Sequence, residues 1–213
     1  CDKPFEVGKS VSGKIDWARR FDHMQQHSGE HICSGLICER FHCDNVGFHM
    51  GADVVTIDFN ADISWDELME IEQLANLYIY EDHPIDIQFY RGAELDKVEY
   101  RSKKPLEGDV RIVSFPGADC CACCGTHVVR SGQVGLVKFL SVQKFRDGVR
   151  IELLSGKRAH RYLSECWAQD VRIAQALSVK PNASFAGVER VLAELSALKP
   201  VSYTHLTLPT NRE

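Results

Sequence analysis

The 213-residue sequence lacks several features that would assign a chain to a class at once. No run of 18 or more apolar residues is present, so we predict no membrane-spanning helix. There is no internal repeat and no low-complexity tract. The sequence starts at Cys1 without an initiator methionine, and its first residues do not show the basic-then-apolar pattern of a signal peptide. We therefore expect a globular fragment or trimmed chain of one or two domains.

An excess of positive charge is also missing. Lys and Arg number 25 against 30 Asp and Glu, and the net charge of −5 argues against a general nucleic-acid binder. The balance is uneven, however, because residues 130–172 contain nine Lys or Arg and four acidic residues. This local excess could contact phosphates, or it could be an ordinary solvated face.

Cysteine is plentiful in contrast, with nine residues, four of them within positions 120–124. Cysteines so close along the chain pair poorly with one another in disulfides. A chain with 44% apolar residues can bury a core without cross-links. Because the cysteines cluster with histidine, we expect a metal site in a reduced, cytoplasmic protein.

Two half-motifs carry the metal prediction. His27 and His31 are four residues apart in a segment with helical spacing, so they would lie on one helix face and could hold one ion. Cys123 and His127 have the same spacing and begin at a turn after an expected strand. Together they offer three nitrogens and one sulfur, a normal tetrahedral set for Zn²⁺. The competitors for the sulfur position are Cys120, Cys121 and Cys124.

Hydrophobic periodicity predicts an α+β protein in which an antiparallel β-sheet packs with helices, and the zinc site lies between the His helix and the Cys/His turn. Helices are expected over residues 22–39, from 64 to the His83-Pro84 break, 156–177 and 184–198. Strands are expected once or twice within 1–22, then over 46–60, from 85, over 111–115, 135–145 and 149–154. Residues 91–109 are expected to form a loop with a short helix.

Capping and turn residues predict some of these helix and strand boundaries more closely. Asp22 is the expected N-cap of the first helix. Ser64 and Glu67 form a capping box, and the flanking Ile63 and Leu68 form a hydrophobic staple. Arg146-Asp147-Gly148 predicts a tight hairpin turn, with Asp-Gly supplying the positive φ angles.

Two segments of the sequence resemble a known protein family. Asp22-His-Met-Gln-Gln-His-Ser-Gly-Glu-His31 and Phe115-Pro-Gly-Ala-Asp-Cys-Cys-Ala-Cys-Cys-Gly-Thr-His-Val128 resemble the alanyl-tRNA editing proteins (the AlaX family) and the editing domain of alanyl-tRNA synthetase. Gly47-Phe-His-Met-Gly51 also follows the family's order, and the resemblance covers about residues 10–163. It implies hydrolysis, in trans, of the ester joining a wrong amino acid, typically serine or glycine, to alanine tRNA.

The resemblance also implies roles for individual residues. The family's HxxxH and CxxxH residues hold zinc, which carries over to His27, His31, Cys123 and His127. Gly125 and Thr126 would lie near the substrate, with His49 on the substrate side. Glu30 departs from the family, in which many members have Thr or Gln at this position. It could act as general base on water, hydrogen-bond a metal ligand, or be an ordinary solvated helix residue. The local basic excess, rather than the resemblance, makes Lys144, Arg146 and Arg150 candidates for contacts with tRNA, whose acceptor end carries the amino acid.

The same resemblance suggests a division of the chain. Residues 1–22 would be the stub of an N-terminal β domain, and 23–163 the metal-dependent editing core, similar to a second additional domain. Residues 164–200 would begin a truncated further domain. Residues 201–213 match neither a helical nor a strand pattern, and we predict a vector-derived tail without function.

Two other functions compete with editing. His27-Ser-Gly-Glu-His31 fits the H-x-x-E-H pattern of inverted zincins, in which Glu30 would be the base of a zinc peptidase. That function needs a third ligand, usually a downstream Glu, and leaves Cys123 and His127 without a role. A non-catalytic structural zinc site in an RNA-binding module would instead predict a closed site with no cleft beside it.

Overall fold

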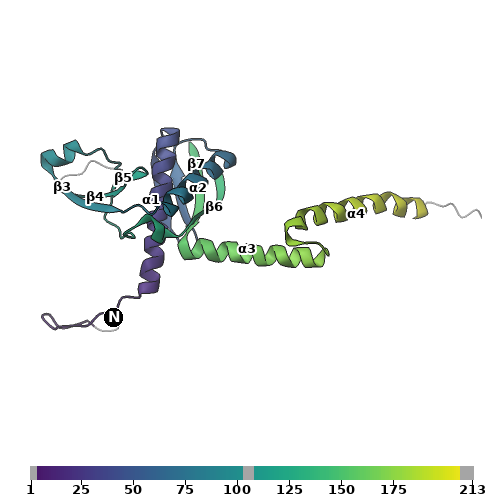
Figure 1. The fold of residues 1–213 in the computed structure, drawn as a ribbon, viewed down its shortest axis with the longest axis horizontal. Coiled ribbons are helices and arrows are strands. Elements are labelled where there is room, and N and C mark those ends of the chain that lie inside the picture. The colour runs from purple at the N-terminus through teal and green to yellow at the C-terminus, as the bar shows by residue number, and fades with distance from the viewer. Residues whose placement is uncertain (1–3, 103–107, 207–213) are drawn as a thin grey trace, which may run out of the picture. The chain divides into compact units, whose positions relative to one another are not determined.

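The structure, a computed structural model, describes residues 4–102 and 108–206. The chain divides into two compact units, Cys1–His160 and Arg161–Glu213. All the described strands and the helices α1 and α2 belong to the first unit, which contains the candidate site (Figure 1). Predictions that concern residues 1–3, 103–107 and 207–213 lie outside the described residues.

The larger sheet of the first unit has four antiparallel strands in the order β1-β2-β7-β6. Its strands are β1 (Asn45–Met50), β2 (Val55–Phe59), β6 (Val137–Phe145) and β7 (Gly148–Ser155). Val55, Ile57 and Phe59 of β2 are buried in the core, as their period of two predicts. The single strand expected over 46–60 is wrong, because the chain reverses between Met50 and Val55 and pairs β1 with β2.

Strands β6 and β7 form the predicted hairpin, but its turn differs in detail. Arg146 has the positive φ, 53°, and Asp147 and Gly148 do not. Gly148 serves close packing instead, because a Cβ there would lie 2.0 Å from the Phe59 carbonyl oxygen. The glycine therefore lets β7 approach the end of β2.

A smaller antiparallel sheet has the order β3-β4-β5. Its strands are β3 (Asp86–Arg91), β4 (Asp109–Phe115) and β5 (Asp119–Ala122), and a 3₁₀ helix, η1 (Gly92–Lys97), follows β3. The short helix expected in the loop after β3 is thus present. Cys120 and Cys121 lie on β5, and Cys123 comes directly after it.

Helix α1 (Trp17–Phe41) begins five residues before the predicted start. Its N-cap is Asp16 rather than Asp22, since the Asp16 carboxylate accepts a hydrogen bond from the Arg19 N–H. Residues 4–16 contain no strand, so in this described part the strands expected within 1–22 are absent. Asp22 accepts instead from the Arg158 guanidinium at the start of α3.

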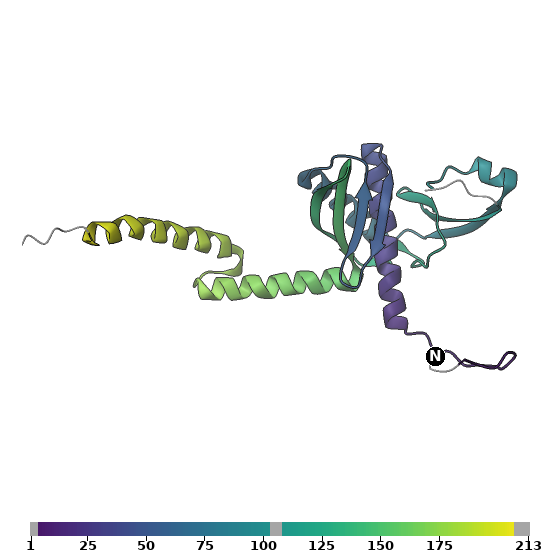
Figure 2. The ribbon, with the colours of Figure 1, turned by 180° about the vertical axis from the view of Figure 1, so that it is seen from behind.

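Helix α1 lies between the two sheets of the first unit (Figures 1 and 2). It packs against β7 on one side and β5 on the other. Gly35 permits the second contact, because a Cβ at this position would lie 2.0 Å from the Ala118 carbonyl oxygen. The close approach brings the His-bearing helix against the strand that leads to Cys123.

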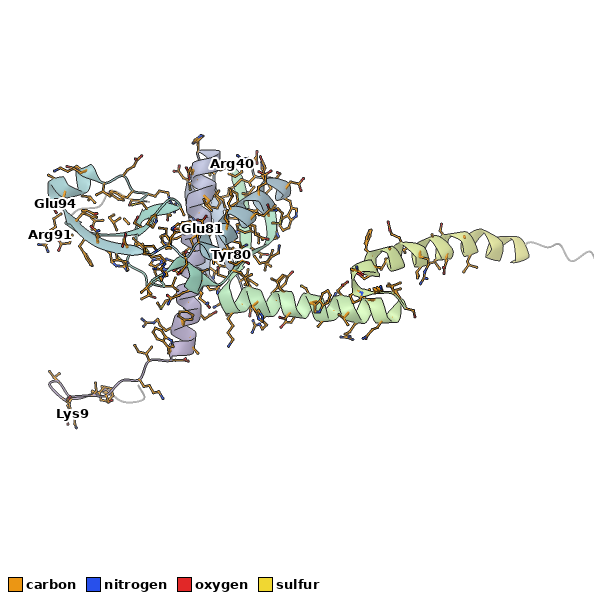
Figure 3. All side chains as sticks on the ribbon, in the orientation of Figure 1. Lys9, Arg40, Tyr80, Glu81, Arg91 and Glu94 are labelled. Carbon is orange, nitrogen blue, oxygen red and sulfur yellow. The ribbon has the colours of Figure 1, made fainter. Side chains whose placement is uncertain are left out.

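Helix α2 (Trp65–Tyr80) confirms the strongest local prediction. Ser64 and Glu67 form the capping box, and Ile63 and Leu68 are both buried. The helix packs on β6, where the Asn76 side chain bonds the Val137 backbone in both directions. On the surface it is joined to α1 by an ion pair between Arg40 and Glu70 at 3.1 Å; Figure 3 labels Arg40.

The second unit consists of helices. α3 (Gly156–Ala176) leads into it from the first unit, and a short 3₁₀ turn, η3 (Pro181–Ala183), separates α3 from α4 (Ser184–Leu206). Both predicted C-terminal helices are confirmed. Residues 201–206 were expected to be neither helix nor strand, which is wrong, because α4 continues past Pro200 to Leu206. None of the described helices is long and apolar enough to cross a membrane.

Candidate metal centre

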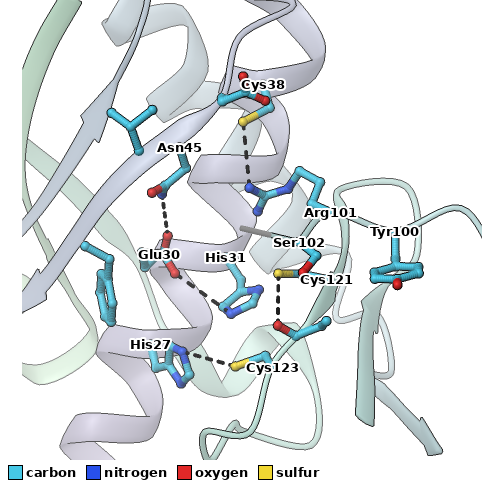
Figure 4. A pocket seen from close by; sticks show the side chains of 14 residues that line it. His27, Glu30, His31, Cys38, Asn45, Tyr100, Arg101, Ser102, Cys121 and Cys123 are labelled. Atoms are coloured by element: carbon cyan, nitrogen blue, oxygen red, sulfur yellow. Dashed lines mark hydrogen bonds and ion pairs between the residues drawn. The ribbon is translucent and has the colours of Figure 1, made fainter. Parts of the chain in front are cut away.

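The structure brings His27, His31, Cys123 and His127 into one cluster, with the ligand atoms all within 4.8 Å of one another. The two histidines of the first pair come from successive turns of α1, and the second pair follows β5. Cys123 Sγ lies 3.6 Å from His27 Nε2 and 3.5 Å from His127 Nε2; Figure 4 shows the first of these contacts. Three imidazole nitrogens and one sulfur at this spacing could hold one metal ion.

Each of the three imidazoles has a partner at Nδ1, which leaves Nε2 to face the cluster. The partners are Asp119 Oδ2 for His31 at 2.8 Å, the Thr126 carbonyl oxygen for His27 at 3.2 Å, and Ser28 Oγ for His127 at 3.2 Å. Such partners fix the tautomer and the ring direction of a metal ligand. Thr126, predicted near the substrate, acts on the site through its backbone.

The cluster also favours the charge state that a metal needs. Burial raises the pKa of the Cys123 thiol, but hydrogen bonds from His127, His27 and His31 outweigh burial and lower this pKa to about 3. Burial lowers the pKa of His31, yet hydrogen bonds with Asp119 and Cys123 and the charge of Glu30 raise it to about 10. Cys123 is therefore a thiolate, the form that binds metals, and an incoming ion would displace the proton of His31.

His127 behaves in the opposite way. Burial lowers the pKa of this imidazole, whereas the hydrogen bond with Cys123 raises it. The nearby charges of His31 and His27 lower it further, so that the pKa of His127 is about 4. His127 is consequently neutral near pH 7, and its Nε2 offers a lone pair without prior loss of a proton.

Glu30 is buried on the same face of α1, with a side chain only 7% exposed. Its Oε1 accepts hydrogen bonds from Ser34 Oγ at 2.7 Å and from Asn45 Nδ2 at 3.0 Å. Its Oε2 lies 3.9 Å from His31 Nε2 (Figure 4). One oxygen is thus fixed by the protein, and the other is turned toward the metal cluster.

A cavity of about 980 Å³ opens beside the cluster. His27, His31, Cys123 and Glu30 all line it (Figure 4). The structural-zinc alternative predicts a closed site with no cleft beside it. The cavity therefore argues against that alternative and leaves space for a substrate.

Phe48, rather than His49, faces this cavity from β1. Phe48 lines the cavity and stacks on the His27 ring, with the ring centroids 5.7 Å apart. His49 is exposed and does not line the cavity. Neighbouring residues of a strand point to opposite faces, which accounts for the difference between Phe48 and His49. The substrate-side position of His49 stays a prediction.

The competing cysteines differ in their positions. Cys124 is exposed, whereas Cys121 forms a second possible ligand group with His31 and Asp119. Asp119, Cys121 and Cys123 alternate along one strand direction and so share a face. Among the described residues, neither group contains the second glutamate that an H-x-x-E-H peptidase requires.

The predicted basic face is largely neutralised by acidic residues from elsewhere in the chain. Lys144 pairs with Asp62 at 2.7 Å, and Arg150 pairs with both oxygens of Asp58 at 2.7 and 2.8 Å. Further pairs join Arg130 to Asp82, Lys138 to Glu72 and Arg158 to Asp22. Arg146 lies over the Phe145 ring, 5.1 Å from its centroid. Contact of Lys144, Arg146 and Arg150 with tRNA stays a prediction. Because of these ion pairs, the positive potential of this surface is weaker than the number of basic residues in 130–172 indicates.

Gly125 approaches His27 so closely that a Cβ there would lie 2.2 Å from His27 Cε1. We predict that Gly125→Ala turns the His27 ring away and weakens metal binding by roughly 10–100-fold, the usual cost of losing a group that orients a ligand. Competition with a chromophoric chelator measures this affinity. Gly13→Ala is the control, because a Cβ at Gly13 meets nothing within 4 Å. An unchanged affinity in Gly125→Ala would show that the ring does not depend on this glycine.

Comparisons with known proteins find relatives over the part of the chain that holds the cluster. The sequence model of the "Threonyl and Alanyl tRNA synthetase second additional domain" matches residues 110–152, which include Cys123 and His127. The alanyl-tRNA editing protein Aarsd1-A of Xenopus laevis is 29% identical over 208 residues, which cover 95% of this chain and 50% of that protein. The alanyl-tRNA editing protein AlaX-L of Pyrococcus horikoshii is 29% identical over 192 residues, covering 86% and 46%.

A longer protein shares the same region. An alanine–tRNA ligase of Methanobrevibacter smithii is 37% identical over 163 residues, which cover 72% of this chain and 18% of the ligase. The chain spans about half the length of the editing proteins that it matches.

Proposed function

Because the chain is an AlaX-like relative of the alanyl-tRNA editing proteins, we propose that it hydrolyses, in trans, the ester bond of alanine tRNA charged with serine or glycine. The cofactor in this proposal is zinc. The observation that carries the proposal is the cluster of three imidazoles and one thiolate on the wall of an open cavity.

The residues of the cluster fit zinc. His27, His31, Cys123 and His127 would hold it, since zinc takes nitrogen and thiolate ligands and the Nδ1 atoms of all three rings are already engaged. Bound zinc would supply a Lewis acid that polarises an ester carbonyl or a water molecule. An aminoacyl ester is already activated, so little more than this and an oriented water is needed.

Glu30 is the residue that we propose as general base. Its Oε2 lies 3.9 Å from His31 Nε2 and on the cavity wall, within reach of a water molecule beside the cluster. The hydrogen bonds from Ser34 and Asn45 to Oε1 hold the carboxylate in place while Oε2 accepts the proton of the attacking water.

The cavity suits the acceptor end of tRNA. Its volume of about 980 Å³ lies at the upper end of the range of small-molecule pockets, and the aromatic rings of Phe48 and Tyr100 form part of its wall. Gly125 and Thr126 do not line the cavity but contact the His27 ring, which does, so they would act on the bound amino acid through the position of that ring. Selection of serine over alanine would follow from hydrogen bonds to the serine hydroxyl.

Deacylation of alanine tRNA charged with serine, glycine or alanine tests the proposal. The chain should release serine or glycine and leave alanine attached, a chelator should stop the reaction, and added zinc should restore it. Loss of all three amino acids at one rate, or of none in the presence of bound zinc, would contradict the proposal.

Glu30→Gln is predicted to slow single-turnover release of serine by roughly 10²–10⁴-fold, the usual contribution of a positioned base. The amide keeps the shape and the hydrogen-bonding acceptor at Oε1, so zinc content should stay the same. Glu39→Gln, at an exposed position of the same helix, is the matched control. Nearly full activity in Glu30→Gln would exclude Glu30 as the base.

A further inference from the structure

Arg101 joins the two parts of the fold that supply the candidate metal ligands. Its Nε and Nη2 donate to the two carboxylate oxygens of Asp119, at 2.7 and 2.9 Å. Its Nη1 lies 3.8 Å from the Sγ of Cys38, two turns beyond His31 on α1 (Figure 4). One guanidinium therefore contacts both the helix that carries the His pair and the strand that leads to Cys123.

The backbone of Arg101 strengthens the same connection. Its N–H donates to the Cys120 carbonyl oxygen at 2.7 Å, and its own carbonyl accepts from the Ala122 N–H at 3.0 Å. The residue thus forms a bridge beside Cys121 at the edge of β5. It holds β5 on the side opposite to β4, just before the chain reaches Cys123.

The carboxylate of Asp119 needs this partner. Its side chain is only 1% exposed, and a buried carboxylate is costly unless it is paired and fully hydrogen-bonded. Asp119 Oδ2 also accepts from His31 Nδ1 at 2.8 Å. The same oxygen is therefore shared between Arg101 and a candidate metal ligand, and the direction of the carboxylate decides the direction of the His31 ring.

We propose that Arg101 is a positioning residue for the metal centre. It fixes the Asp119 carboxylate through a two-point contact, and the carboxylate fixes His31 with Nε2 toward the cluster. The proposal rests on the proposed zinc centre, and it adds to that centre a residue from the loop between β3 and β4. A lysine could supply the charge but not the planar two-point contact, so the two side chains should differ in effect.

Zinc affinity and the absorption spectrum of the cobalt-substituted protein test this proposal without any measurement of activity. Arg101→Gln should weaken zinc binding by roughly 10–100-fold, as expected for a partner that orients a ligand, and should alter the cobalt spectrum. Arg101→Lys should lie between Arg101→Gln and the unchanged chain. Because Arg101 acts through Asp119, the double variant with Asp119→Asn should bind zinc no more weakly than Asp119→Asn alone.

Arg91→Gln is the matched control. Arg91 forms an ion pair with Asp109 in the same small sheet, but both side chains are largely exposed; Figure 3 labels Arg91. This variant should bind zinc and cobalt as the unchanged chain does. Unfolding of the metal-free proteins separates a general loss of stability from a change at the metal, and Arg101→Lys keeps the comparison available if Arg101→Gln does not fold.

Three results would overturn the proposal. Normal zinc affinity with an unchanged cobalt spectrum in Arg101→Gln would show that Arg101 does not position the centre. Additive losses in the double variant would show that Arg101 acts independently of Asp119. Failure of the unchanged chain to bind zinc would overturn both this proposal and the proposed function, whereas the first two results leave the proposed function intact.

Discussion

Cys123→Ala is expected to abolish zinc binding by the chain. Cys123 supplies the sulfur of the cluster, and its Sγ lies within 3.6 Å of two of the three imidazoles. Without it, the three imidazoles remain around an incomplete site that lacks its thiolate. The loss of affinity should therefore exceed the roughly 10–100-fold cost of losing a partner that only orients a ligand. The release of serine from alanine tRNA should disappear together with the metal.

Metal analysis after dialysis against a weak chelator measures this effect. Cys124→Ala is the matched control, because Cys124 is the next residue but is exposed and lies outside both ligand groups. It should keep one zinc per chain. Retention of zinc by Cys123→Ala together with its loss in Cys121→Ala would assign the sulfur ligand to Cys121 and contradict the proposed set.

Gly35→Ala is expected to have the largest effect on stability. The new Cβ would lie 2.0 Å from the Ala118 carbonyl oxygen and 2.7 Å from Asp119 Cβ. Since the closest of these atoms belongs to the backbone, α1 and the β4–β5 turn must separate. Overpacking usually costs about 1–3 kcal/mol, and the gain in helix propensity offsets about 1 kcal/mol, so we expect the free energy of unfolding to fall by up to about 2 kcal/mol.

The same shift would move His31 away from Asp119, so Gly35→Ala should also weaken zinc binding. Urea unfolding followed by circular dichroism measures the stability. Gly187→Ala in α4 is the control, because the atoms nearest to a Cβ there are side-chain atoms of Leu177 and Val179, at 3.0–3.3 Å, and not a backbone oxygen at 2.0 Å. A Gly35→Ala protein as stable as the unchanged chain would contradict the tight contact between α1 and the small sheet.

The parts of the fold that the sequence predicts best depend on local chemistry. Helix α2 has its capping box and hydrophobic staple within six residues, and its start is confirmed. The start of α1 was predicted wrongly, because Asp22 was expected as the N-cap and Asp16 caps the helix instead. The carboxylate of Asp22 pairs with Arg158, 136 residues away, which no local pattern reveals.

The candidate site shows the same limit. The four-residue spacing within each half-motif identified His27, His31, Cys123 and His127 as possible partners. Their spacing could not reveal Asp119 and Arg101, which reach the site only through the register of β5 and the loop after β3. For Asp119 a signal existed, because it alternates with Cys121 and Cys123 along an extended segment. Arg101 lies in a polar loop and has no such signal.

Surface charge could not be predicted from local counts either. The excess of basic residues in 130–172 is real in the sequence, but the acids that neutralise it come from α1, β2 and the segments around α2. Lys144 and Asp62, for example, are 82 residues apart. The sequence also could not show which face of β1 points to the cavity. Phe48 and His49 lie on opposite faces of the strand, and only the pairing of β1 with its neighbours decides between them.

X-ray absorption at the zinc edge of the purified chain tests the central claim, that four named side chains form one zinc centre. We predict one zinc per chain with three nitrogen neighbours at about 2.0–2.1 Å and one sulfur neighbour at about 2.3 Å. A zinc-free chain that cannot be reconstituted, or a zinc ion with two or more sulfur neighbours or none, would contradict the claim.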